Sequence, residues 1–160
     1  MYSSSLARVR TNSIGRTSRS NSITSATDGP IASILDTIST DVIHQVRRMP
    51  NPPSAVQHLF EVAYLILEKD KDMYTRNGIP TWSSLKRCLD ERFLQQMRAF
   101  SPANCHRAHR DWLCSTYFNP SLSGQYLVSM ERVKNAHSVV CPIFTWCAHI
   151  LKPPGVKLAE

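Results

Sequence analysis

Apolar residues recur at helical spacing along most of the chain after residue 30. The first series has spacings of four, three, four, four and three residues and consists of Ile31, Leu35, Ile38, Val42, Val46 and Met49. Such a series forms one apolar stripe along a helix, at a spacing close to that of a coiled-coil strand. Because fewer than three heptads precede Pro50, this helix is expected to need a partner.

A proline-rich break separates this helix from the next apolar series. Asn51 is expected to cap the second helix, with Pro52 at its first position. The second series predicts a one-sided core face and consists of Val56, Leu59, Phe60, Ala63, Ile66 and Leu67. A loop is expected at residues 77–80. Helical spacing then resumes from Leu85 to Phe100, with a break expected near Asp90.

The last third of the chain shows two more helical segments. Ser101 and Pro102 form a second cap-and-start pair. The inner face of the helix that they open is expected to hold Cys105, His109, Trp112 and Leu113. After a loop at residues 119–124, a further stretch runs from 126 to 140, restarts at Pro142 and ends at residues 153–155. Strand-type alternation is nowhere sustained, so the pattern predicts an all-α fold.

Residues 1–30 differ in composition from the rest of the chain. They hold eight Ser, four Thr and four Arg, and Asp28 is their only acidic residue. A segment with so few buried-type residues cannot offset its ordering entropy and is expected to be a disordered tail. A mitochondrial transit peptide has a similar composition, but the arginines at 8, 10, 16 and 19 do not face a convincing apolar stripe.

The net charge of the chain indicates which classes of partner it would bind. The formal net charge is +7, which favours nucleic acid, an anionic membrane or an acidic protein surface such as a microtubule. Between Arg92 and Lys134, six basic residues stand against two acidic ones. No apolar run approaches the ~20 residues that a spanning helix needs. The tryptophans fall at core positions rather than at stacking positions. We therefore expect neither nucleic acid nor membrane as the partner.

Motifs for catalysis are missing from the sequence. It contains no phosphate-binding glycine loop, no GxGxxG, no HExxH and no GxSxG. Two His/Cys pairs, Cys105 with His109 and His137 with Cys141, have a spacing that could begin a zinc site, but each sits among apolar residues at core spacing. The five cysteines form no CxxC pair and favour reduced thiols. We expect no enzyme activity, cofactor or metal.

One stretch of the sequence resembles a known family. The run from Gln45 to Val56 reads Q-V-R-R-M-P-N-P-P-S-A-V and resembles the junction where the ascending stalk helix of a dynein heavy chain enters its microtubule-binding domain. The family reads approximately E-V-R-x-M-x-N-P-P-x-x-V there. The similarity continues in order through Thr81-Trp82, the segment 93–100, Asn119-Pro120 and the segment from Val133 to Trp146.

The resemblance implies a small helical bundle at the end of a truncated coiled-coil stalk helix, which docks on tubulin. It divides the chain into a tail (1–30), an ascending helix (31–50), a stalk-tip domain (51–152) and the start of a descending arm (153–160). A full dynein heavy chain is an ATPase, whereas this segment holds only the tip. The implied setting is the cytoplasm and cytoskeleton, including the cilium or axoneme.

In the family, basic residues on the first, third and last helices meet acidic tubulin. The corresponding candidate contacts in this chain are Gln57, His58, Arg92, Arg98, Arg107, Arg110, Arg132, Lys134 and Thr145. Gln57, His58, Asn135 and Thr145 stand where the family usually carries basic residues, which predicts weakened binding. Tubulin is the expected partner, and other dynein subunits are compatible. The alternative is a non-motor interaction module that has lost microtubule binding and offers the Ile31–Met49 stripe to a partner helix.

Overall fold

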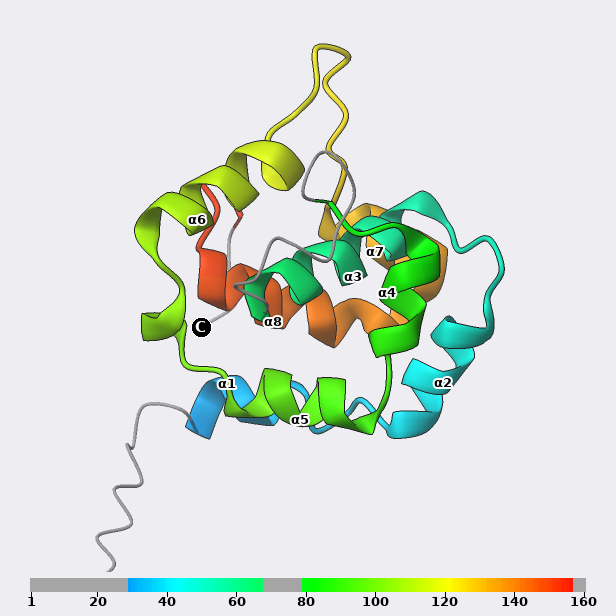
Figure 1. Ribbon diagram of the computed structural model, residues 1–160. Coiled ribbons are helices and arrows are strands. Elements are labelled where there is room, and N and C mark those ends of the chain that lie inside the picture. Colours follow the sequence, from blue (N-terminus) through cyan, green and yellow to red (C-terminus); the bar gives the residue numbers. More distant parts are fainter. Residues whose placement is uncertain (1–28, 68–78, 157–160) are drawn as a thin grey trace, which may run out of the picture.

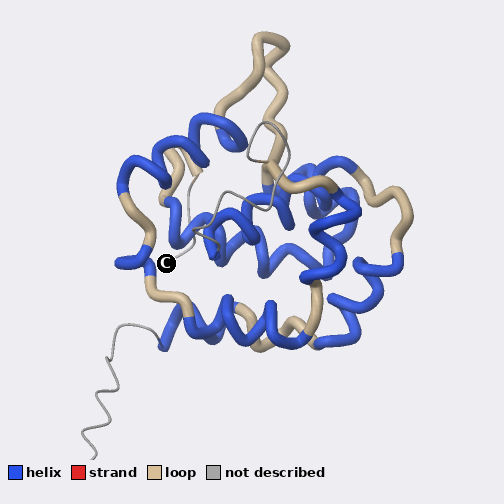
Figure 2. Tube along the Cα trace, in the orientation of Figure 1, coloured by secondary structure: helices blue, strands red, loops and turns tan. Residues whose placement is uncertain are grey.

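The computed structural model describes residues 29–67 and 79–156 (Figure 1). Within these ranges the chain is built from helices and loops, which confirms the all-α prediction (Figure 2). No strand occurs in the part of the chain that the structure describes, and a single isolated β-bridge joins Pro120 to Tyr126. The expected tail, apart from residues 29–30, and residues 157–160 of the expected descending arm lie outside the described residues.

The helices pack around a central pair, α3 and α8, which lie against each other (Figure 1). In chain order the α-helices are α1 (Gly29–Ile34), α2 (Thr40–Arg48), α3 (Ser54–Leu67), α4 (Trp82–Cys88), α5 (Glu91–Ala99), α6 (Arg107–Leu113), α7 (Met130–His137) and α8 (Cys141–Leu151). A π-helical turn, Cys114–Phe118, extends α6, and a 3₁₀ turn, Ser138–Val140, links α7 to α8. α5 packs against α1, α2 and α3, and α7 packs against both central helices.

α3 is buried on nearly every side because other helices surround it. The one-sided face expected for it was too narrow, since Glu61, Val62, Tyr64 and Leu65 are buried along with the apolar series. α8 fills the other half of the core with Ile143, Phe144, Trp146, Cys147, Ile150 and Leu151. A helix that is apolar almost all round needs such a central position. The core therefore runs through the middle of the domain between these two helices.

The prediction of one helix across residues 31–50 needs correction. The chain forms α1, turns between Leu35 and Ser39, and continues as α2, although no glycine or proline lies in that turn. Leu35 and Ile38 are both buried, because α1 packs on α5 and α8 while α2 packs on α4 and α5. Because the segment bends, the apolar side chains of its first half and of its second half are buried against different helices. The stripe that the alternative function offered to a partner helix is thus largely covered by helices of the same chain.

Helix starts agree with the local signals at several places. The Thr81 and Asp90 side chains accept hydrogen bonds from the backbone N–H groups of Ser84 and Phe93, so both residues are N-caps, and the cap at Asp90 agrees with the break expected there. The start of α3 lies two residues later than expected. The carbonyl of Pro53 accepts from the N–H groups of Val56 and Gln57, at 2.9 and 3.0 Å, so Ser54 begins the helix.

The segment opened by Ser101 is also less regular than expected. A 3₁₀ turn at Pro102–Asn104 is followed by a break before α6 begins. Cys105 and Leu113 are buried as predicted, but Trp112 is 38% exposed and stacks on His109 with 5.9 Å between the ring centroids. Trp112 therefore does not belong to the inner face of this helix.

Candidate functional site

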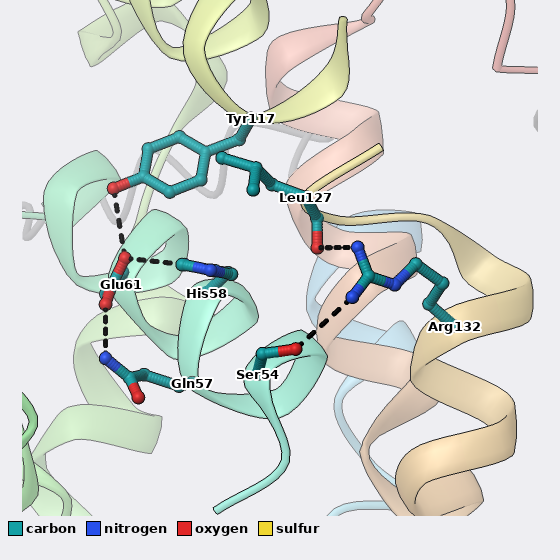
Figure 3. Close-up of polar contacts among 7 residues, drawn as sticks. All are labelled: Ser54, Gln57, His58, Glu61, Tyr117, Leu127 and Arg132. Carbon is teal, nitrogen blue, oxygen red and sulfur yellow. Dashed lines mark hydrogen bonds and ion pairs between the residues drawn. The ribbon is translucent and has the colours of Figure 1, made fainter. Parts of the chain in front are cut away.

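A buried carboxylate lies at the centre of the polar contacts in the domain (Figure 3). Glu61, on α3, is only 3% exposed. Gln57 Nε2 donates to its Oε1 at 3.0 Å, and His58 Nδ1 lies 3.1 Å from its Oε2. The hydroxyl of Tyr117, 56 residues further along the chain, donates to Oε2 at 3.2 Å. These partners satisfy a group that would be costly to bury alone.

This cluster changes the interpretation of two predicted contact residues. Gln57 and His58 were expected to face tubulin, but both turn their side chains toward Glu61 (Figure 3). Burial, together with the charge and hydrogen bond of Glu61, raises the pKa of Tyr117 well above its usual value. The phenol therefore stays protonated and acts as the donor. The cluster ties the π-helical turn to α3, and its side chains are committed inside the fold.

Removing the Tyr117 hydroxyl tests the contribution of this cluster. Tyr117→Phe is expected to lower the free energy of unfolding by about 1.5–3 kcal/mol, because a hydrogen bond to a charged acceptor is lost in the interior. The measurement is urea denaturation followed by circular dichroism. As a matched control, Tyr126→Phe removes a hydroxyl from an exposed loop and is expected to change stability by less than about 0.5 kcal/mol. Equal stability of the two variants would show that the buried hydroxyl is energetically unimportant.

Two of the predicted cations are also used within the fold. Arg132 donates to Ser54 Oγ at 3.2 Å and to the carbonyl oxygens of Tyr126 and Leu127, so it fastens a long loop to the start of α3 (Figure 3). Arg98 Nη2 donates to the carbonyl oxygens of Leu35 and Ile38, at 3.3 Å each. These arginines hold backbone carbonyls in place, which accounts for their charge without any external partner.

The other predicted positions differ in their surroundings. Thr145 is half-buried on α8 and donates to the carbonyl of Cys141 at 3.3 Å, so its hydroxyl also has an internal partner. Arg92 and Lys134 are exposed on α5 and α7. Arg107 is exposed on α6 and lies 3.7 Å from Asp111, an ion pair open to solvent and therefore weak.

The structure does not bring all the predicted contacts together. Arg110, half-buried on α6, lies on the same short helix as Arg107. In Figure 1, α6 and α5 lie on opposite sides of the central pair, so Arg92 is separated from these two arginines. The predicted set thus divides into residues committed inside the fold, exposed cations on α5, α6 and α7, and the half-buried Arg110.

A second group of cations was not singled out from the sequence. α2 ends in Arg47 and Arg48, and the last turn of α4 holds Lys86 and Arg87. The two helices pack together, and Trp82 Nε1 donates to the carbonyl of Met49 at 3.0 Å across their junction. Basic residues in a last helical turn are favoured by the helix dipole, which accounts for these pairs locally. Two basic pairs at helix ends are the signal that could have identified them.

The cysteines and histidines among the described residues were candidates for a zinc site or a nucleophile. Residues 29–67 and 79–156 contain no group of three or more His, Cys, Asp or Glu side chains placed to hold a metal ion. His109 is engaged with the carbonyl oxygen of Leu65, 2.8 Å from its Nε2. Burial raises the pKa of the Cys105, Cys114 and Cys147 thiols, which keeps them protonated and poorly nucleophilic.

Comparison with known proteins gives no family. No family model, no curated protein and no solved structure matches the chain. None of the helices among the described residues is long and apolar enough to cross a membrane. A function must therefore be argued from the residues and their arrangement.

Proposed function

We propose that this chain is a microtubule-binding module that docks on acidic tubulin through cations that its fold leaves exposed. The observation that supports this most directly is that few Lys and Arg side chains form ion pairs with carboxylates of the same chain. Among the described residues, Arg107 is the only Lys or Arg within 4.0 Å of a carboxylate oxygen. Exposed cations without internal counter-ions keep most of their interaction energy available for an acidic partner.

The resemblance to the dynein stalk tip selects the microtubule among acidic partners. The residues that carry it run from Gln45 to Trp146, and they lie on an all-α domain. Because the fold uses Arg98 and Arg132, and because Arg92 lies on the other side of the central pair, the proposed contact residues are reduced to Arg107, Arg110 and Lys134. A small set of solvent-exposed ion pairs gives fast, weak and salt-sensitive binding. The proposal assigns no nucleotide chemistry to these residues and places the protein on the cytoskeleton.

Two matched charge variants test which cations form the interface. The first removes three charges from α6 and α7 (Arg107→Gln, Arg110→Gln and Lys134→Gln), and the second removes three from α2 and α4 (Arg47→Gln, Arg48→Gln and Arg87→Gln). Both leave the same net charge. Cosedimentation with stabilised microtubules is expected to show about tenfold weaker binding for the first variant, from about three surface ion pairs. The second variant is expected to lose clearly less of its microtubule binding than the first.

The comparison separates a specific interface from general attraction. Equal losses in the two variants would mean that only net charge matters, and the assignment to α6 and α7 would then be wrong. Circular dichroism checks that both variants stay folded, as expected for surface substitutions.

A further inference from the structure

One segment of the chain gathers nearly all of the exposed apolar side chains. Among the described residues the exposed large apolar side chains are Trp112, Leu122, Tyr126, Leu127, Met130 and Val139, and all but the last lie between residues 112 and 130. That segment contains no Lys, Arg, His, Asp or Glu. Single exposed apolar residues are ordinary on protein surfaces, but a cluster within an uncharged segment indicates an interaction site.

The middle of this segment is a loop, residues 119–129, that projects from the helical body (Figures 1 and 2). Its two arms pair at the Pro120–Tyr126 bridge, and Ser121 N–H donates to the carbonyl of Gln125 at 2.8 Å. Gly124 adopts φ +73°, a conformation that other residues rarely take, and its N–H closes the tip by donating to the Ser121 carbonyl at 2.8 Å. Leu122, at this tip, is fully exposed. Local hydrogen bonds thus hold the turn that presents Leu122 to solvent.

An apolar groove of about 480 Å³ lies at the base of the loop. Its lining is mostly apolar and consists of Phe118, Tyr126, Val128, Ser129, Met130, Phe144, Thr145, Pro154, Gly155 and Val156. Tyr126 and Met130 belong both to the exposed set and to the groove wall. The apolar surface therefore includes side chains of the loop and the groove beside it.

Basic residues stand on both sides of the uncharged segment. α6, which precedes it, carries Arg107 and Arg110 against Asp111, and α7, which follows it, carries Lys134 against Glu131, whereas Arg132 is bound to carbonyls of the loop itself. An apolar tip with an aromatic residue behind it and cations on the flanking helices matches a bilayer interface, where apolar side chains enter the acyl region and cations meet anionic headgroups.

We propose that the loop of residues 119–129 inserts into the surface of an anionic lipid bilayer, with Leu122 as the deepest side chain and Tyr126 at headgroup level. A projecting tip suits a fluid phase, which accepts an apolar side chain without a preformed pocket. Serine, asparagine and glutamine in the loop add no charge that would oppose entry. This inference rests on exposed apolar side chains that the microtubule proposal does not use, although both proposals use Arg107, Arg110 and Lys134. It departs from the expectation that no membrane is a partner. That expectation considered spanning helices, whereas the loop needs only peripheral contact.

Vesicle flotation tests the proposal with the full chain. The protein is expected to float with vesicles of phosphatidylcholine and phosphatidylserine, and less with phosphatidylcholine alone. Insertion of the apolar tip and attraction of the cations to anionic headgroups are each weak and are both needed for stable binding. Leu122→Ser is expected to weaken binding about tenfold, the effect of losing one inserted leucine. Since the Leu122 side chain is fully exposed, this variant keeps the fold. Val139→Ser, another exposed position, lies beyond α7 and is expected to bind like the unchanged chain.

Three results would overturn the inference. The first is no flotation of the folded protein with phosphatidylserine vesicles at low salt, which would leave a pocket on a partner protein as the use of the loop. The second is equal binding by Leu122→Ser and the unchanged chain, which would reduce the attraction to charge alone. The third is equal weakening by Leu122→Ser and Val139→Ser. Microtubule cosedimentation of Leu122→Ser is expected to be unchanged, so the two proposals can fail separately.

Discussion

Trp146→Ala is expected to lower the free energy of unfolding by about 3–5 kcal/mol, the largest effect of any change considered for this chain. The indole is fully buried on α8, where its ring meets Phe100 edge-on at 6.1 Å between ring centroids. Its Nε1 donates to the carbonyl of Met97 at 3.1 Å, which joins α8 to α5. Alanine would leave a large cavity and remove this hydrogen bond, so the Met97 carbonyl would keep only the backbone N–H of Phe100, 3.3 Å away.

Urea denaturation followed by circular dichroism measures this loss. Trp146→Phe is the informative second variant, because it keeps an aromatic ring at this position while it removes the indole N–H and part of the ring volume. It is expected to cost about 1–3 kcal/mol. A loss below about 1 kcal/mol for Trp146→Ala would mean that the contact between α8 and α5 does not anchor the core.

Arg98→Met is expected to cost about 2–4 kcal/mol, because two hydrogen bonds from a charged group to backbone carbonyls are lost together. Both carbonyls, of Leu35 and Ile38, flank the turn between α1 and α2. Methionine keeps much of the length of the side chain, so the loss reports on the guanidinium rather than on packing. The Nε of Arg98 is buried without a hydrogen-bond partner among the described residues, so part of the guanidinium lies inside the fold and is not a freely solvated surface charge.

Arg92→Met provides the matched control for this experiment. Arg92 lies on the same helix and is exposed, so its replacement is expected to change stability by less than about 0.5 kcal/mol. Amide hydrogen exchange gives a second readout, since protection in α1 and α2 is expected to fall more than protection in α3. Equal effects of the two substitutions would refute a structural role for Arg98.

The sequence predicted well those features that depend on a few neighbouring residues. The break near Asp90 is one of them, because the Asp90 carboxylate accepts from the backbone N–H of Phe93, three residues on, and so starts a new helix. The end of α8 before Pro153 likewise follows from residues at the helix end. All-α character follows from spacing alone, because apolar residues at three- and four-residue intervals suit a helix with one or more covered faces.

Features that depend on distant residues could not be predicted in this way. The turn between α1 and α2 is held by Arg98, 60 residues or more away, and nothing in residues 35–39 breaks a helix by composition. The apolar spacing of the segment is the same for one straight helix and for two bent ones. The packing of α4, α5 and α8 against this segment decides between the two arrangements.

The candidate contacts show the same limit. Gln57 and His58 sit on a helix surface by spacing, but Glu61 and the distant Tyr117 turn them inward. Arg132 is a cation of the kind expected at an interface with acidic tubulin, but its guanidinium instead donates hydrogen bonds to Ser54 and to the loop. Charge on a helix is visible in the sequence, whereas the partner of that charge depends on which segment packs beside it.

The salt dependence of microtubule cosedimentation tests the central claim most directly. The Debye length shortens from about 30 Å at 0.01 M to about 8 Å at physiological ionic strength, so binding by exposed cations is sensitive to added salt. We expect the unchanged chain to pellet with microtubules at low salt and to lose most of that binding at moderate salt. Absence of pelleting at low salt, with the helical fold confirmed by circular dichroism, would contradict the account, and so would binding that salt does not weaken.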